Sequence, residues 1–469
     1  MKKKIYFVIN NNIYIRNFIK TKIIKKLNHK FDVSLIFNKN LYKDKSIKKY
    51  NKNKTFFYSS SNNNNLMLKY HDIKSTYYKK NSKFFQFRLL RLYRYDIRYL
   101  NELLLSKGIK NNIINKIFNF HYLIKNFTLF LVFKILSTFV FFPVVKKYIT
   151  NLPKNDSIEK IIKKLDGEIF IIPTSGYDAD TIHFIDLLKK NKKKSYLIVD
   201  NWDNLSSKII LDNLPDRIAV WGAQTKLHAK KIQKMNANKI KILGSARSES
   251  LFSERYKKHK SRYKNYILFL GSAWAWDEEG VLTRIDNFLT KNKIKNLQII
   301  YRPHPFRQRK TLISKFWKYI KVDKQLYDNK SKKFLKRSWP DLNYYPSLIQ
   351  NSKFIIGGLT SMMIESTIFW KSYLAIGFDD NFSLMNQKNA LKYFTHLEGI
   401  EKLPNIKICK NINNFDKYLH NMIKSHVKKI PSSGIRLNID KKREFFLSGN
   451  EGTYTERLIN DVNKFSNVF

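Results

Sequence analysis

Short apolar runs alternate along most of the chain with longer amphipathic segments. Continuous runs of roughly four to eight apolar residues are typical of strands buried on both faces, and apolar residues spaced three or four apart are typical of helices. The runs at residues 5–9 and 33–37 are separated by a Lys-rich helical stretch. This order predicts the opening of a parallel sheet.

After Pro153 the alternation becomes regular and predicts two series of strands and helices. The first is predicted to contain strands 168–172, 195–199, 217–221 and 239–243 with helices 179–190 and 224–235. The second is predicted to contain strands 266–270, 297–301, 319–323, 353–356 and 373–377 with helices 279–290, 345–351 and 361–370. Such alternation is typical of βαβ units and parallel sheets.

The charged segment 254–264 is the best candidate for a linker between the two series. We therefore expect an N-terminal α/β domain at residues 1–253 and a C-terminal α/β domain at residues 264–469. The last segment, 454–469, is predicted to be a helix and is assigned to the C-terminal domain.

Residues 84–150 interrupt the N-terminal series with helical character. From Phe84 to about Lys125 the apolar residues recur at helical spacing, which predicts one or two amphipathic helices. The stretch 127–142 is the most apolar in the chain, but Lys134 interrupts it and it is shorter than a spanning helix requires. Two interpretations stay open: a buried core helix, or a helix lying in a bilayer interface with Lys146 and Lys147 at the headgroups.

The composition excludes a disordered chain and favours an anionic partner. Of 469 residues, 43% are hydrophobic and 15% aromatic, and the length favours two hydrophobic cores. Lys and Arg number 90 against 36 Asp and Glu, which gives a formal charge of +54. A nucleotide substrate or an anionic membrane surface fits this charge better than nucleic acid, because no recognition helix, zinc spacing or ribonucleoprotein signature accompanies it.

A single cysteine, Cys409, excludes an internal disulfide and a thiolate metal cluster, as expected in a reducing compartment. Lys2–Lys4 and the apolar run 5–9 imitate a signal peptide, but no small-residue cleavage site follows. We therefore expect a cytoplasmic protein, with peripheral attachment to the inner face of the cell membrane as an open option.

In open α/β sheets, ligands bind beyond the carboxyl ends of the strands, so the residues that follow each predicted strand are the first candidates for a site. Strand 297–301 is followed by Arg302-Pro303-His304-Pro305. Two prolines stiffen this turn, so that Arg302 can hold a diphosphate while His304 protonates or hydrogen-bonds a leaving phosphate oxygen. A surface turn with solvated side chains is the alternative.

Strand 353–356 is followed by Gly357-Gly358-Leu359-Thr360-Ser361 and then by a helix. The glycines allow a ligand to approach the backbone closely, and the hydroxyls of Thr360 and Ser361 add donors for phosphate. Glu365, one turn into the helix, is a candidate to bind a ribose. An N-capped helix with a solvated glutamate is the alternative interpretation.

Strand 266–270 is followed by a segment that contains Ser272, a candidate donor-binding residue, and the pair Glu278 and Glu279. Carboxylates in this position suit a base that deprotonates an acceptor hydroxyl, although acidic residues at a helix N-terminus are also ordinary dipole partners.

In the N-terminal domain, strand 195–199 is followed by a polar segment that suits a sugar acceptor. Its candidate acceptor-binding residues are Trp202, Asn204, Ser206 and Lys208. Asp203 is a further candidate for the base, and a solvated loop is the alternative. No metal site is predicted: Asp178 and Asp180 form the only tight Asp-x-Asp, and helix capping explains them better than Mg²⁺ binding.

The ordered series Glu278-Glu279-Gly280, His304-Pro305 and Thr360-Ser361 resembles the motifs of bacterial sialyltransferases. That resemblance implies that an acidic residue is the base, that the histidine faces the donor phosphate and that the hydroxyls bind the nucleotide. The turns 302–305 and 244–247 also resemble those of CDP-glycerol glycerophosphotransferases. The segment 200–208, however, lacks the histidine of their Trp-His-Gly element.

Both families have the GT-B architecture, so the resemblance implies two doubly wound Rossmann-like α/β domains facing a central cleft. In such folds the last helix often crosses back to the first domain. The predicted function is a metal-independent glycosyltransferase without a cofactor, which moves a sugar from a nucleotide-sugar donor to a surface-polysaccharide or lipid-linked glycan acceptor of the bacterial cell envelope. Three alternatives stay open: a CDP-glycerol-type glycerophosphotransferase, a nucleotide-sugar epimerase, and a non-enzymatic basic protein of membrane surfaces.

Overall fold

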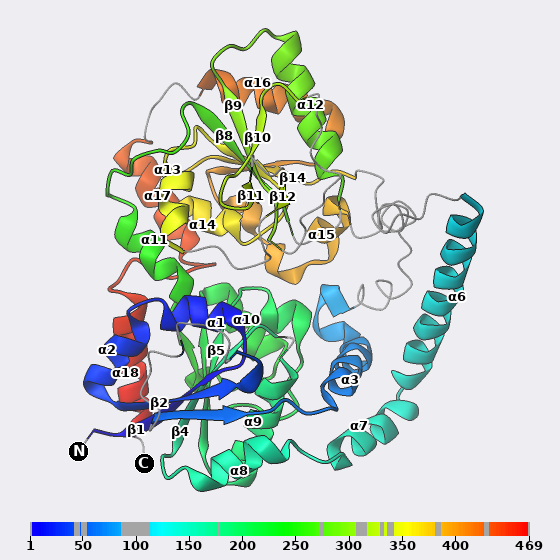
Figure 1. Ribbon diagram of the computed structural model, residues 1–469, viewed down its shortest axis with the longest axis vertical. Coiled ribbons are helices and arrows are strands. Elements are labelled where there is room, and N and C mark those ends of the chain that lie inside the picture. The colour runs from blue at the N-terminus through cyan, green and yellow to red at the C-terminus, as the bar shows by residue number, and fades with distance from the viewer. Residues whose placement is uncertain are drawn as a thin grey trace. The chain divides into compact units, whose positions relative to one another are not determined.

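The computed structural model describes residues 2–41, 47, 54–85, 112–176, 178–272, 276–305, 317–328, 333–334, 342–379, 386–425 and 431–467. The chain divides into two compact units (Figure 1). The first unit comprises Met1–Arg88, Phe133–Glu249 and Glu444–Phe469, and the second comprises Leu89–Val132 and Ser250–Arg443.

The first unit is built on a parallel sheet of seven described strands in the order β3-β2-β1-β4-β5-β6-β7. The strands are β1 (Lys4–Ile9), β2 (Asp32–Asn38), β3 (Thr55–Tyr58), β4 (Ile169–Thr174), β5 (Lys194–Val199), β6 (Arg217–Val220) and β7 (Ile240–Ile242). Chain order reverses between β1 and β4, which are hydrogen-bonded neighbours. Ligands of doubly wound sheets bind beside such a reversal, beyond the carboxyl ends of the strands.

Helices flank this sheet (Figure 1). They are α1 (Asn12–Tyr14), α2 (Ile23–Lys30), α3 (Asn64–Tyr77), α7 (Phe141–Asn151), α8 (Asp156–Lys164), α9 (Ala179–Lys190), α10 (Ala223–Lys231) and α18 (Tyr454–Ser466). Two π-helical turns, Ile15–Ile19 and Asn204–Lys208, follow β1 and β5. The central strands β1, β4, β5 and β6 are almost wholly buried, whereas the edge strands β3 and β7 are partly exposed.

The second unit contains a parallel sheet of six described strands in the order β10-β9-β8-β13-β14-β15, and a separate antiparallel pair, β11 (Tyr327–Asp328) and β12 (Lys333–Phe334). The six strands are β8 (Tyr266–Leu270), β9 (Gln298–Arg302), β10 (Ile320–Val322), β13 (Ile355–Gly357), β14 (Tyr373–Ile376) and β15 (Ile406–Cys409). Its reversal of chain order lies between β8 and β13. The helices are α11 (Glu249–Glu254, which begins at the unit boundary), α12 (Glu278–Lys291), α13 (Tyr345–Gln350), α14 (Met362–Ile368), α15 (Gln387–Tyr393), α16 (Phe415–Ser425) and α17 (Ser433–Arg443).

The final helix belongs to the first unit, so its assignment to the C-terminal domain is wrong. In α18, Asp461 accepts a hydrogen bond of 2.7 Å from the hydroxyl of Tyr196 on β5, and its carboxylate lies 3.7 Å from the guanidinium of Arg217 on β6. The ring of Phe465 packs edge-on against Tyr196. The apolar face of this helix completes the core of the first unit, which is why the chain returns there.

The apolar stretch 127–142 is not one helix. Helix α6 (Asn112–Leu136) ends within this stretch. After a sharp bend, α7 begins at Phe141. Pro143 explains the break, because its ring would clash with the carbonyl of Phe139 in a continuous helix. Most described apolar side chains of the stretch are exposed, which contradicts the interpretation as a buried core helix.

Candidate functional site

Four segments of the second unit meet beyond the carboxyl ends of β8, β9 and β13. They contain, in turn, Gly271, His304, Gly358 and Gln387. Gly271 allows two of them to touch: a β-carbon there would lie 3.0 Å from the backbone nitrogen of His304 and 2.7 Å from Oε2 of Glu278. Gly358 allows the third to approach, since its β-carbon would lie 3.3 Å from Ser272 and 2.9 Å from Nε2 of Gln387. The structure thus brings Ser272, His304 and the glycine pair of the sequence prediction into one place.

Glu278 holds two of these segments together. Its Oε1 accepts a hydrogen bond of 2.9 Å from the backbone N–H of Ser272, and its Oε2 accepts one of 2.6 Å from the hydroxyl of Tyr301 on β9. The glutamate is buried, and both oxygens accept protein donors. Glu278 therefore serves as a positioning residue for the strand-end segments.

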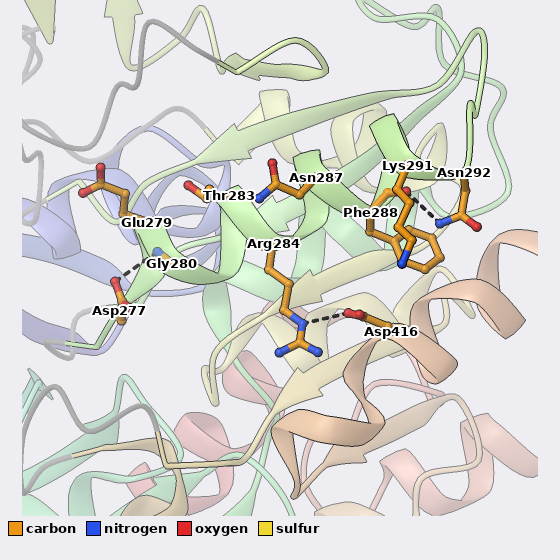
Figure 2. A pocket seen from close by; sticks show the side chains of 10 residues that line it. All are labelled: Asp277, Glu279, Gly280, Thr283, Arg284, Asn287, Phe288, Lys291, Asn292 and Asp416. Atoms are coloured by element: carbon orange, nitrogen blue, oxygen red, sulfur yellow. Dashed lines mark hydrogen bonds and ion pairs between the residues drawn. The ribbon is translucent and has the colours of Figure 1, made fainter.

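Glu279 is separated from Glu278 although the two are adjacent in sequence, because consecutive helical residues point about 100° apart. Figure 2 shows it with Asp277 at the start of α12, where they line an open pocket of about 880 Å³ with residues from α12 and Asp416 of α16. Of the two glutamates, Glu278 therefore makes structural contacts in the interior, whereas Glu279 lines an open pocket.

Arg302 is engaged by the protein. Its guanidinium forms a buried ion pair with Asp323, donates a hydrogen bond of 2.8 Å to the side chain of Gln325, and lies 4.7 Å from the ring centre of Tyr345. These contacts fix the end of β9 and with it the turn that carries His304, which is partly exposed.

The glycine pair is fixed by two side chains that the sequence prediction did not include. The hydroxyl of Tyr373 donates a hydrogen bond of 2.8 Å to the carbonyl of Gly358, and Oε1 of Gln387 accepts one of 3.0 Å from the N–H of Leu359. Burial raises the pKa of Tyr373, so this tyrosine keeps its proton. Neither residue follows a predicted strand closely, so the strand-end rule could not find them.

The other predicted donor-binding residues lie on the same segment. Thr360 and Ser361 are partly exposed where β13 leads into α14, and Glu365 is buried within α14. Gly357 packs tightly: a β-carbon there would lie 2.5 Å from the carbonyl oxygen of Leu270. This glycine is required by strand packing, whereas Gly358 faces Ser272.

The predicted acceptor segment of the first unit is mostly interior. Trp202, Asn204 and Ser206 are buried, and the amide of Asn204 donates a hydrogen bond of 2.8 Å to the carbonyl of Thr174. Lys208 is partly exposed, with its ammonium 3.3 Å from the carboxylate of Asp203. Of this segment, Asp203 and Lys208 are the side chains best placed to meet a ligand.

Buried charges beside this segment form a cluster that the sequence prediction missed. Asp200 accepts a hydrogen bond of 2.7 Å from the amide of Asn17, which in turn accepts one of 3.0 Å from Arg16. Burial raises the pKa of Asp200, and nearby Arg247 and Arg16 oppose that shift. Arg16 and Asn17 lie on the π-helical turn Ile15–Ile19, beyond the residues that directly follow the strand predicted at 5–9, so the strand-end rule did not include them.

Asp178 is the N-cap residue of α9, at the helix start where the sequence placed it, but its side chain makes no capping hydrogen bond. The carboxylate of Asp178 accepts hydrogen bonds of 2.7 Å from the hydroxyl of Tyr14 and from the N–H of Ser175. Asp180 accepts hydrogen bonds from several side chains, including one of 2.8 Å from Ser60. Within the described residues, no group of three or more His, Cys, Asp or Glu side chains is placed to hold a metal ion.

No protein-family model matches the chain. Among curated proteins it is similar to protein Ycf2 of Physcomitrium patens, with 23% identity over 491 aligned positions that cover 98% of this chain and 19% of Ycf2. The chain thus spans about a fifth of the length of this relative, and an identity this low shows no common family.

The similarity to solved structures extends over both units. The UDP-GlcNAc 2-epimerase of Methanocaldococcus jannaschii aligns with 98% of this chain and 99% of its own, at a TM-score of 0.52 and 11% identity. S. aureus MnaA, in a structure with UDP, aligns with 100% of this chain and 98% of its own, at a TM-score of 0.51 and 11% identity. The chain therefore has the two-domain, Rossmann-like GT-B fold, as predicted.

Proposed function

We propose that the chain is a nucleotide-sugar-dependent glycosyltransferase that binds its donor at the strand ends of the second unit. The acceptor would be a surface polysaccharide or a lipid-linked glycan, and transfer would need no metal. The fold supports the proposal, since a solved structure of the same fold carries UDP. The convergence of Ser272, His304 and Gly358 beyond the switch point of the sheet supports it further.

The hydroxyl of Ser272 is the observation that carries this proposal. It is fully buried, and among the described residues it has no hydrogen-bond partner. A buried hydroxyl without a partner costs roughly 1–3 kcal/mol of stability. Next to it lies Gly358, where a β-carbon would come within 3.3 Å of the Ser272 hydroxyl. A phosphate or ribose oxygen of a bound nucleotide would accept the hydrogen bond that the protein leaves unmade.

The remaining roles follow from the contacts. His304, held against Gly271, would donate a proton or a hydrogen bond to the leaving phosphate, and Arg302 would act through the turn that it fixes. Thr360 and Ser361 would bind the nucleotide phosphates, and Glu365 the ribose. Glu279 and Asp203 are the carboxylates that we propose as candidates for the base, because Glu278 is occupied by Ser272 and Tyr301.

A thermal-shift screen of the full chain against CMP, CDP, UDP and GDP tests the donor site. A ligand that binds only the native state raises the melting temperature, by an amount set by its concentration relative to its Kd. We expect one nucleotide to stabilise the chain in the presence of a metal chelator. If none of the four does so at millimolar concentration, the proposed donor site is wrong.

Replacing Ser272 by Ala is expected to change stability and affinity in opposite directions. The free chain should gain about 1 kcal/mol of unfolding free energy, because the buried hydroxyl is removed, and the nucleotide should bind about tenfold more weakly. Chemical denaturation and isothermal titration measure the two effects.

Ser248 supplies the matched control, since its hydroxyl is also buried and also lacks a partner among the described residues, but it lies in the first unit. Ser248→Ala should raise stability without changing nucleotide affinity. Equal affinity of Ser272→Ala and the unaltered chain would remove Ser272 from the site.

A nucleotide-sugar epimerase is the second candidate, because the solved structures that align above a TM-score of 0.5 include a UDP-GlcNAc 2-epimerase and a complex of MnaA with UDP. Incubating the chain with UDP-GlcNAc alone distinguishes the two functions by NMR. An epimerase inverts a sugar carbon without any acceptor. A transferase leaves the sugar configuration unchanged until an acceptor is added.

A further inference from the structure

The bend between α6 and α7 presents an unusually apolar surface, which we call the elbow (residues 131–148). The exposed fractions of its side chains reach 81% for Phe139 and 65% for Val144. Other exposed apolar residues of the elbow are Leu131, Val132, Ile135, Val140, Phe141 and Tyr148. Contiguous exposed apolar surface of this kind marks an interaction site.

The elbow is held in place by aromatic contacts of Phe142 with Tyr70, Tyr77 and Tyr78. Phe142 is buried and stacks on the ring of Tyr77 of α3, with centroids 4.0 Å apart. Because this side chain faces α3, the stripe formed by Phe141, Val144 and Tyr148 on the same helix faces away from it. The exposure is therefore a consequence of how α7 packs.

The serine and threonine hydroxyls in and beside the elbow bond to their own helices. The hydroxyls of Ser137 and Thr138 donate hydrogen bonds of 3.0 and 2.8 Å to backbone carbonyls of α6, and Thr150 does the same within α7 at 2.8 Å. Hydroxyls that bond their own helix can enter an apolar phase at little cost. These hydroxyls therefore need no partner from outside the chain. A lipid phase, which offers none, suits them better than a protein surface, which would supply side-chain partners.

The charge on the elbow has one sign. Between residues 112 and 151 the sequence has lysines at 116, 125, 134, 146 and 147, and neither Asp nor Glu. Lys134, Lys146 and Lys147 are exposed beside the apolar side chains. Lysines next to an apolar surface can extend their ammonium groups to anionic headgroups while their methylenes cover lipid.

The geometry of the two helices suits the surface of a bilayer. Among the described helices no single one is long and apolar enough to cross a membrane, whereas the pair Ile124–Leu136 and Phe141–Asn151 qualifies jointly but is bent by 94°. Helices with an apolar side and basic flanks lie in the plane of the interface. We propose that the elbow docks the protein onto an anionic lipid bilayer, with Phe139, Phe141 and Val144 inserted below the headgroups. This inference does not depend on the enzymatic function.

Flotation of the full chain with vesicles tests the docking surface. The chain should float with vesicles that mix phosphatidylcholine and phosphatidylglycerol, and Phe139→Ser/Val144→Ser should bind about tenfold more weakly or worse, because two side chains no longer leave water. Leu227→Ser, which alters an exposed apolar residue of α10, should bind as before.

The lysines are tested with a matched pair. Lys146→Gln/Lys147→Gln should weaken binding to the anionic vesicles about fivefold or more, since each lysine near an anionic surface contributes roughly 1 kcal/mol. Lys230→Gln/Lys231→Gln removes the same charge from adjacent exposed lysines of α10 and should have a much smaller effect. Equal losses from the two pairs would show that net charge, and not the elbow, binds the lipid.

Insertion can be followed directly, because Cys409 is the single cysteine and is buried. An environment-sensitive fluorophore on Phe139→Cys should shift its emission to the blue on anionic vesicles, while the same label on Leu227→Cys should not. Absence of flotation and of the shift would overturn the proposal. So would a dimer without lipid that Phe139→Ser/Val144→Ser converts to a monomer, because the elbow would then bind a second copy of the chain.

Discussion

Replacing Asp323 by Ala is expected to lower the free energy of unfolding of the second unit by about 3–5 kcal/mol, because the guanidinium of Arg302 would remain buried without its counter-ion. Asp323 is fully buried, and it also accepts a hydrogen bond of 3.0 Å from the hydroxyl of Tyr263. Its removal therefore leaves several donors unsatisfied at once. Chemical denaturation followed by circular dichroism measures the effect.

The pair Arg284 and Asp416 supplies the control in the same unit. These side chains form an ion pair of 2.7 Å, but they are 34% and 45% exposed (Figure 2). Exposed pairs contribute roughly 0–1 kcal/mol, so Asp416→Ala should leave stability almost unchanged. Similar losses from the two variants would show that burial of the Arg302 pair does not determine its strength.

This result would also separate two roles of Arg302. The sequence predicts that the guanidinium of Arg302 holds a diphosphate. In the structure, this group instead contacts Asp323, Gln325 and Tyr345. A guanidinium with these partners has few donors left for a ligand. We expect Arg302 to influence donor binding mainly by fixing the turn at His304.

The parallel sheets were predictable because their strands are buried on both faces. Runs such as 266–270, which matches β8 in full, are uninterrupted apolar segments between polar ones. Strands β3 and β15 were missed. Each is a four-residue strand, β3 follows a Lys- and Asn-rich stretch and β15 includes Lys407, so neither shows a clear apolar run. Tertiary pairing forms such strands where the local signal is weak.

The motifs placed candidate residues on the right loops, but they could not predict the direction of the side chains. Glu278 and Glu279 illustrate this, since one turns toward Tyr301 and the other lines the pocket on α12. Trp202 and Asn204 similarly follow a strand and yet point into the core. A polar residue at a strand end can bind a ligand or fasten a loop, and only the fold decides between these roles.

The apolar stretch 127–142 was ambiguous for a physical reason. A core helix and an interfacial helix have the same composition, because both transfer apolar side chains out of water. The stacking of Phe142 on Tyr77 determines which residues face outward, and it depends on a contact with α3. The sequence could therefore state the two interpretations but could not choose between them.

Replacing His304 by Ala is expected to reduce turnover with the true donor by about 100-fold or more, the range for losing a general acid or a preorganised hydrogen-bond donor. The fold should persist, because the imidazole is partly exposed and the contact with Gly271 is made by the backbone nitrogen of His304. The loss should fall on kcat, with nucleotide affinity changed little. Steady-state kinetics together with isothermal titration separate these two terms.

Two comparisons make the His304 result decisive. His420→Ala removes a partly exposed histidine from α16 of the same unit and should leave turnover unchanged. His304→Gln keeps a hydrogen-bond donor but cannot transfer a proton, so it should recover part of the lost rate if the imidazole only stabilises charge and almost none if it acts as the acid. Turnover of His304→Ala at the rate of the unaltered chain would show that His304 has no part in the chemistry, even if Ser272 still binds the nucleotide.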